Sequence, residues 1–257
     1  SSAVASVLSM VTATAWLAFR LRSIHSPLAP DAEFARHMRI KAGILKTVLK
    51  VGVPTGVQMI VIALAEVALL SLVNSYGSGA TAAYGAVNQV VAYVQFPAIS
   101  IAITASILGA QAIGAGRTDK LGTIARTGLM MNLTLTGALV VIGYLFSRHL
   151  MGFFITSEPV IELSQNLLHI MLWSSVIFGM QAVVSGIMRA SGTVWVPMGI
   201  SIFCIALIEV PFAWFMSHRI GISGIWMAYP VTFVAMLTLQ TAYYRLVWRK
   251  KAIRRLI

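Results

Sequence analysis

The sequence predicts an all-α membrane protein, a polytopic bundle of six complete transmembrane helices preceded by the truncated end of another. The first observation is composition: 58% of the 257 residues are hydrophobic and 10% are charged, whereas a soluble domain carries about 25% charged residues. The second is the run between Lys50 and Arg117, in which the sole charged residue is Glu66. A membrane crossing needs roughly 20 apolar residues, so this run predicts two helices.

The first of seven apolar segments, residues 3–19, starts the chain without an initiator Met or a basic leader region. It is typical of the second part of a transmembrane helix rather than of a signal peptide, and we expect its upstream part to lie outside this sequence. The six complete spans are predicted at residues 51–76, 80–113, 121–146, 161–188, 194–216 and 225–248.

A polar connection separates the first two segments. It contains the proline-marked SPLAPD and then the basic stretch HMRIKAGILKTVLK, which predicts an amphipathic helix at the membrane surface. The predicted organisation is therefore a helix end at 1–19, a linker at 20–50, a six-helix unit at 51–248 and a basic tail at 249–257.

The basic residues indicate the orientation. With these spans, 17 of the 19 Lys and Arg residues fall on one side of the membrane, and only Arg148 and Arg219 fall on the other. Because basic residues collect in cytoplasmic loops, we expect the linker and the C-terminus to be cytoplasmic and the membrane to be a bacterial inner membrane. The net charge of +12 then indicates the lipid bilayer as partner, and no nucleic acid.

Glu66 is the strongest functional candidate. A charged residue at bilayer depth costs about 2.5–3.5 kcal/mol and usually marks an ion pathway, and apolar surroundings favour proton uptake. The alternative is a protonated glutamate hydrogen-bonded to a neighbouring helix. Gln58 and Asn74 lie eight residues to either side, each offset from Glu66 by about 80° on a helix.

The next span carries a polar stripe, Tyr84, Asn88, Gln95 and Ser106, within about 40° on a helical wheel. Such a stripe suits a substrate or ion path, or hydrogen bonds between helices worth about 0.6 kcal/mol each. Pro97 is expected to kink this helix.

Pro54 lies in the stretch GVPTG, which we expect to start the span of Glu66. It is either an N-terminal feature of that helix or a hinge.

A third stripe is formed by Ser174, Gln181 and Ser185, of which Gln181 is the expected functional member. Glu209 is a second acid inside a span, two residues before Pro211. It could join an ion relay or reach the outer interface, and we favour the interface.

Nothing in the sequence indicates an enzyme. It contains no nucleotide-binding glycine loop with a lysine, no metal-spaced histidine pair and no nucleophile elbow. The single cysteine, Cys204, allows no disulfide within the chain. We therefore expect no organic cofactor and no dedicated metal centre.

Several runs resemble the second lobe of multidrug and toxic compound extrusion (MATE) transporters: the long run from VGVPTGVQMIVIALAEVALL to ILGAQAIGAGR, then FITSEPVIELSQNLL, MQAVVSGIMRASGTVWVP and GISGIWMAYP. The resemblance implies two six-helix lobes, of which this chain holds the end of helix six, the linker and helices seven to twelve. It implies a secondary active antiporter that exports small cationic, amphipathic drugs or metabolites in exchange for protons or Na⁺. The N-terminal lobe would then be a partner missing from this sequence.

The resemblance also assigns residues. Glu66 matches the acid that family members carry in helix seven. Some sodium-linked members carry an Asp in helix ten, where this sequence has Phe178. That difference favours protons as the coupling ion, with Na⁺ near Glu66 as the alternative.

Two other functions stay open from the sequence, a lipid-linked oligosaccharide flippase of a related fold and a non-transporting membrane subunit. The spans carry two acids and, away from their ends, no Lys or Arg, which suits cations better than an anionic pyrophosphate lipid.

Overall fold

The computed structural model describes residues 2–24 and 42–250, and all of its regular elements are helical. The chain divides into two compact units, Ser1–Leu49 and Lys50–Ile257, which are described separately. The predicted SPLAPD turn and most of the basic tail lie outside the described residues, so these parts of the predicted organisation stay predictions.

The first unit contains α1 (Ser2–Ser23), an apolar helix with large hydrophobic side chains exposed along its length. Both of its threonine side chains are satisfied within the helix. The hydroxyl groups of Thr12 and Thr14 donate hydrogen bonds of 2.8 Å to the carbonyl groups of Leu8 and Met10. Internal satisfaction of this kind is what a hydrocarbon environment requires.

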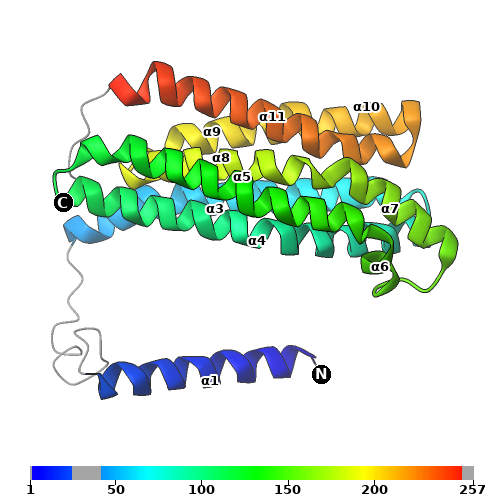
Figure 1. Ribbon diagram of the computed structural model, residues 1–257, viewed down its shortest axis with the longest axis horizontal. Coiled ribbons are helices and arrows are strands. Elements are labelled where there is room, and N and C mark those ends of the chain that lie inside the picture. Colours follow the sequence, from blue (N-terminus) through cyan, green and yellow to red (C-terminus); the bar gives the residue numbers. More distant parts are fainter. Residues whose placement is uncertain (1, 25–41, 251–257) are drawn as a thin grey trace. The chain divides into compact units, whose positions relative to one another are not determined.

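The second unit is a bundle of long helices that run up and down side by side (Figure 1). It takes in most of α3 (Ala42–Asn74) and then α4 (Ser78–Gly114), η1 (Thr118–Lys120), α5 (Leu121–Leu145), α6 (Ser147–Gly152), α7 (Glu158–Leu172), α8 (Ser174–Ala190), α9 (Trp195–Cys204), η2 (Ile205–Glu209), α10 (Val210–Ile220), α11 (Ile222–Leu246) and η3 (Trp248–Lys250).

The predicted membrane spans are confirmed. Seven helices in the described residues are long and apolar enough to cross a membrane, at Val4–Ser23, Val48–Asn74, Ser78–Gly114, Thr118–Leu145, Glu158–Ala190, Trp195–Ile220 and Ile222–Lys250. The protein is a multi-pass integral membrane protein.

Two spans are less regular than predicted. The span at 161–188 is two helices, α7 and α8, which meet at Trp173, where the Ser174 hydroxyl donates a 2.6 Å hydrogen bond to the carbonyl of Met171. The span at 194–216 contains a π-helical turn, η2, in which the N–H of Val210 bonds the carbonyl of Ile205. Neither break begins at a glycine or proline, which would have indicated it in the sequence.

The prediction that GVPTG starts a helix is wrong. α3 already begins at Ala42, so Pro54 lies in its interior. An interior proline cannot donate the backbone hydrogen bond of its turn, and only the hinge interpretation of Pro54 remains as a prediction. Pro97 is likewise inside a helix, α4, which continues through it.

Small residues bring α4, α5 and α8 into close contact. A side-chain Cβ at Gly186 would lie 2.7 Å from the carbonyl oxygen of Ala102, and one at Gly179 would lie 2.8 Å from Cβ of Ala98. Asn132 of α5, fully buried, donates a 3.0 Å hydrogen bond to the carbonyl of Val176 near the start of α8. Close approach of this kind replaces the hydrophobic drive that helices lack in lipid.

We expect Gly179→Ala to destabilise the protein by about 1–3 kcal/mol, because the added methyl group overlaps Oδ1 of Asn132 as well as Ala98. Thermal unfolding in detergent micelles measures the effect as a lowered Tm. Gly137→Ala on α5 is the matched control, since a Cβ there meets nothing within 4 Å and alanine favours the helix. Equal Tm values for the two variants would contradict the close contact at Gly179.

Candidate functional site

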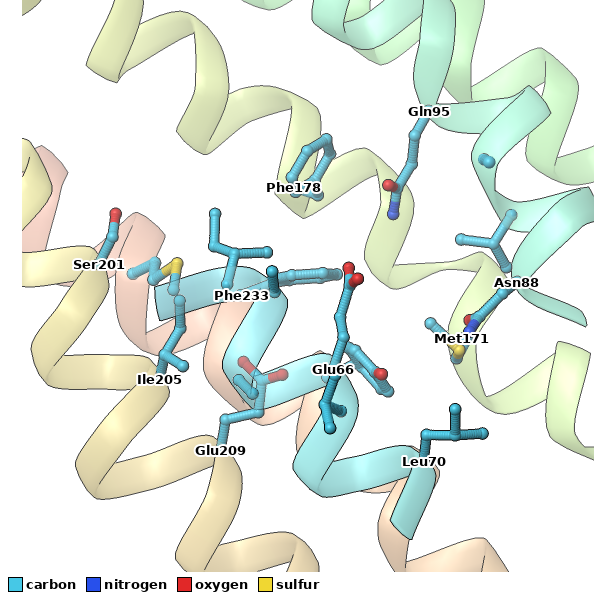
Figure 2. Close-up of a pocket in the computed structure, with 18 of the residues that line it drawn as sticks. Glu66, Leu70, Asn88, Gln95, Met171, Phe178, Ser201, Ile205, Glu209 and Phe233 are labelled. Atoms are coloured by element: carbon cyan, nitrogen blue, oxygen red, sulfur yellow. The ribbon is translucent and has the colours of Figure 1, made fainter. Parts of the chain in front are cut away.

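A cavity of about 700 Å³ lies within the second unit, on the side where α3, α4, α8, α9 and α11 face one another (Figure 2). We call it the Glu66 cavity. Its lining residues are Gln58, Ile62, Ala63, Ala65, Glu66, Val67, Leu70, Tyr84, Asn88, Val91, Ala92, Gln95, Met171, Phe178, Gln181, Ser201, Ile205, Glu209, Tyr229, Phe233 and Met236.

The structure brings most of the candidate residues of the sequence together around this cavity. Those that line it are Gln58, Glu66, Tyr84, Asn88, Gln95, Gln181 and Glu209. The other polar candidates do not line it, namely Asn74, Ser106, Ser174 and Ser185. The Asn74 side chain accepts a 2.7 Å hydrogen bond from Thr81 near the turn between α3 and α4, and Ser174 is buried at the start of α8.

Glu66 reaches the cavity because of how α3 packs. Ala65, Leu69 and Val73, spaced four residues apart, form the buried stripe of the helix. Glu66 lies beside this stripe, where its side chain is exposed on this unit and lines the cavity together with Ala65. No described residue forms a hydrogen bond or ion pair with its carboxylate. The alternative interpretation, a glutamate hydrogen-bonded to a neighbouring helix, therefore finds no partner in this unit.

The favoured interpretation of Glu209 is wrong. Its side chain does not reach the outer interface; it is 7% exposed and lines the Glu66 cavity. The π-helical turn η2 ends at Glu209 and shares the cavity with Ser201 and Ile205 of the same span. Figure 2 shows Glu66 and Glu209 on neighbouring helices beside the same opening.

Aromatic side chains form one wall of the cavity. Phe178 of α8 packs on Phe233 of α11 with ring centroids 5.2 Å apart, and Phe233 lies 6.3 Å from Tyr229. The hydroxyl groups of Tyr229 and Tyr84 are hydrogen-bonded at 3.1 Å.

The sequence analysis did not single out the contribution of α11, namely Tyr229, Phe233 and Met236. Their spacing of four and three residues was a usable signal, since it puts them on one helical face. The pairing of Tyr229 with Tyr84, 145 positions earlier, had no such signal.

The electrostatic character of the cavity follows from its lining. Among the described residues, its lining includes two carboxyl groups and no Lys, Arg or His. In the part of the chain that the structure describes, no three His, Cys, Asp or Glu side chains converge as metal ligands would. An ion could be held here only by the two carboxylates with the neighbouring amide and hydroxyl oxygens.

Comparisons with known proteins identify the family. The MatE family profile matches residues 54–215, more than half of the chain. The chain belongs to the MATE family. It is 43% identical over 258 residues to the probable multidrug resistance protein YoeA of Bacillus subtilis, covering all of this chain and 56% of YoeA. The probable multidrug resistance protein NorM of Thermotoga maritima is 22% identical over 211 residues, which cover 81% of this chain and 46% of NorM.

Solved structures agree on the fold. A crystal structure of MATE in complex with MaL6 superposes with a TM-score of 0.85 at 20% identity, covering 95% of this MATE chain and 55% of that protein. A MOP superfamily transporter from Pyrococcus furiosus, for which reversed polarity of the binding pocket suggests a different function, gives a TM-score of 0.73 at 18% identity and covers 84% of this chain and 49% of its own. The chain spans about half the length of the relatives it matches.

We expect a cysteine at position 88 to react with a water-soluble maleimide, because Asn88 lines the cavity and a thiol ionises only where water reaches it. The variant is Asn88→Cys combined with Cys204→Ser, which removes the single native thiol. The reaction rate is followed in membrane vesicles. The matched control is Ile103→Cys, also on α4 and exposed but outside the cavity lining. Equal rates at the two positions would contradict a water-filled cavity at Asn88.

Proposed function

We propose that this chain is one lobe of a secondary active efflux transporter that exports cationic, amphipathic drugs or metabolites in exchange for protons or Na⁺. The observation that carries the proposal is the lining of the Glu66 cavity, in which two carboxyl groups face an otherwise uncharged wall of amide, hydroxyl and aromatic groups. The similarity to YoeA and NorM, both named as probable multidrug resistance proteins, supports it. A second lobe completes the transporter.

The cavity suits such compounds in size and chemistry. Its volume of about 700 Å³ falls within the range of about 300–1,000 Å³ typical of pockets for drug-sized ligands. The carboxylate of Glu66 attracts a positive charge, and the rings of Phe178, Tyr229 and Phe233 offer apolar and cation–π contact to the rest of the molecule. Asn88, Gln95 and Gln181 supply hydrogen-bonding groups that tolerate different substrates.

Coupling follows if the substrate and the ion compete for the same carboxylate. Deprotonated Glu66 binds the cation, and uptake of a proton removes the charge and releases it. The two ligands then weaken each other's binding by the same factor, which is reciprocal negative coupling. We favour the proton because Phe178 adds no oxygen ligand for Na⁺ in this lobe.

The orientation follows the basic residues. Figure 1 shows the α4–α5 connection and the end of α11 at one end of the bundle and the α10–α11 turn at the other. We propose that the first end, which holds Arg117, Lys120 and Arg249, faces the cytoplasm.

The flippase alternative is less favoured because its substrate is anionic. No basic side chain of residues 2–24 and 42–250 lines the cavity to bind a pyrophosphate. A non-transporting subunit would have no use for a carboxyl group that faces an open cavity within the membrane.

We expect Glu66→Gln to abolish proton-driven efflux of a cationic dye, because the glutamine side chain has no negative charge to bind the dye and takes up no proton to release it. The measurement uses vesicles that carry this lobe together with its companion lobe, under an imposed proton gradient and separately under a Na⁺ gradient. Glu162→Gln is the matched control, since Glu162 is exposed on α7 and outside the cavity lining.

Each outcome of this experiment has a consequence. Efflux that runs on protons and is lost only in Glu66→Gln supports the proposal. Normal efflux by Glu66→Gln would exclude Glu66 as the coupling residue. Efflux driven only by Na⁺ would reverse the preference for the proton, and transport of an anionic lipid with no dye efflux would support the flippase.

A further inference from the structure

Glu209 is a buried acid without a compensating partner. Its side chain is 7% exposed, and no hydrogen bond or ion pair joins it to any described residue. Burying an unpaired charge is costly unless the group is neutralised or paired. Since its exposed remainder opens into the Glu66 cavity, whatever balances this carboxyl group must come from the cavity.

The backbone at Glu209 is irregular, and this irregularity places the residue beside the cavity. It closes the π-helical turn η2, and Pro211 follows two residues later. A π-helical turn makes bonds from residue i to i+5 and is frequent at functional sites. Pro211 lacks the N–H that a regular helix would direct at Leu207, so the wider turn and the proline occur together next to the acid.

The charged group that faces Glu209 across the cavity is another carboxylate. Glu66 lines the same cavity and interacts electrostatically with Glu209. Among the described residues, Tyr229 of α11 interacts with both acids and Cys204 of α9 with Glu209, and neither carries a positive charge. Tyr84 of α4, which lines the cavity and is hydrogen-bonded to Tyr229, carries none either. Two like charges close together in an apolar site do not both stay ionised without a cation.

We propose that Glu66 and Glu209 form a two-carboxylate site that holds one positive charge between them, either a shared proton or the cationic group of the substrate. This inference rests on the proposed function and deepens it. When the substrate leaves, a proton takes its place between the same two carboxyl groups. The charge of the pair with its ligand is then the same before and after the exchange, so the buried site never holds two uncompensated negative charges.

The tyrosine pair supports a shared proton at this site. Tyr84 and Tyr229 are bonded through their hydroxyl groups at 3.1 Å, and one of the two hydroxyl hydrogens is used in that bond. The second is left to donate to a carboxylate, and Tyr229 interacts electrostatically with both Glu66 and Glu209. A donated hydrogen bond stabilises the negative charge that remains after one proton is shared.

The test measures binding rather than transport. Equilibrium binding of radiolabelled tetraphenylphosphonium to the complete transporter in detergent is followed as a function of pH, for wild type and Glu209→Gln. Protons compete with tetraphenylphosphonium, so its binding falls as the pH falls. In Glu209→Gln the remaining acid has no like charge beside it and stays ionised in more acidic solution. We expect the pH of half-maximal binding to fall by about one pH unit or more, together with weaker binding at alkaline pH.

Three further variants make the result specific. Glu209→Asp keeps the second charge, so its pH of half-maximal binding should match that of the wild type. A merely structural role of Glu209 would not predict this match. Glu209→Asp also provides a second test of the site if Glu209→Gln fails to fold. Glu162→Gln should leave the pH profile unchanged. Glu66→Gln should lose pH-dependent binding altogether.

The outcomes separate this inference from the proposed function. An unchanged midpoint in Glu209→Gln, with pH dependence lost in Glu66→Gln, would overturn the two-carboxylate site and leave the proposed function standing. Unaltered pH-dependent binding in Glu66→Gln would overturn the proposed function. A different outcome is displacement of tetraphenylphosphonium by Na⁺ at constant pH in the wild type and not in Glu209→Gln. That result would overturn the shared proton in favour of a bound Na⁺.

Discussion

Close contact between α4 and α8 is the constraint on which the rest of this lobe depends. Gly179 and Gly186 let the two backbones approach, and a hydrogen bond from Asn132 joins α5 to the start of α8. Because these contacts fix α8, they also set the positions of Phe178 and Gln181, which project from its other face into the cavity. We therefore expect that adding a single methyl group in this interface shifts the wall of the Glu66 cavity.

Much of the architecture could be predicted because lipid imposes simple rules. Every span must be helical and about 20 residues long, so the seven apolar runs gave the seven helices. The break at Trp173 and the turn at Ile205–Glu209 could not be predicted, since neither begins at a glycine or proline. These irregularities come from packing against other helices, which no local pattern of the sequence records.

The same reasoning explains which site residues were predictable. Glu66, Asn88 and Gln95 stood out because polar groups are rare in spans, and all three line the cavity. Glu209 was assigned to the wrong surroundings because its position along the span suggested the outer interface, whereas the π-helical turn that it closes lies against the cavity. Ser174 was misleading because its hydroxyl is satisfied locally, by the carbonyl of Met171 in the last turn of α7.

The exposed carboxylate of Glu66 has a consequence for biogenesis. On this unit the acid and its neighbouring amides form a polar face at the depth of the bilayer, and exposing a charge to hydrocarbon costs about 2.5–3.5 kcal/mol. Such a face is tolerable only when water or a second lobe covers it. A unit of this kind that entered the bilayer uncovered would therefore expose a costly polar face to the hydrocarbon.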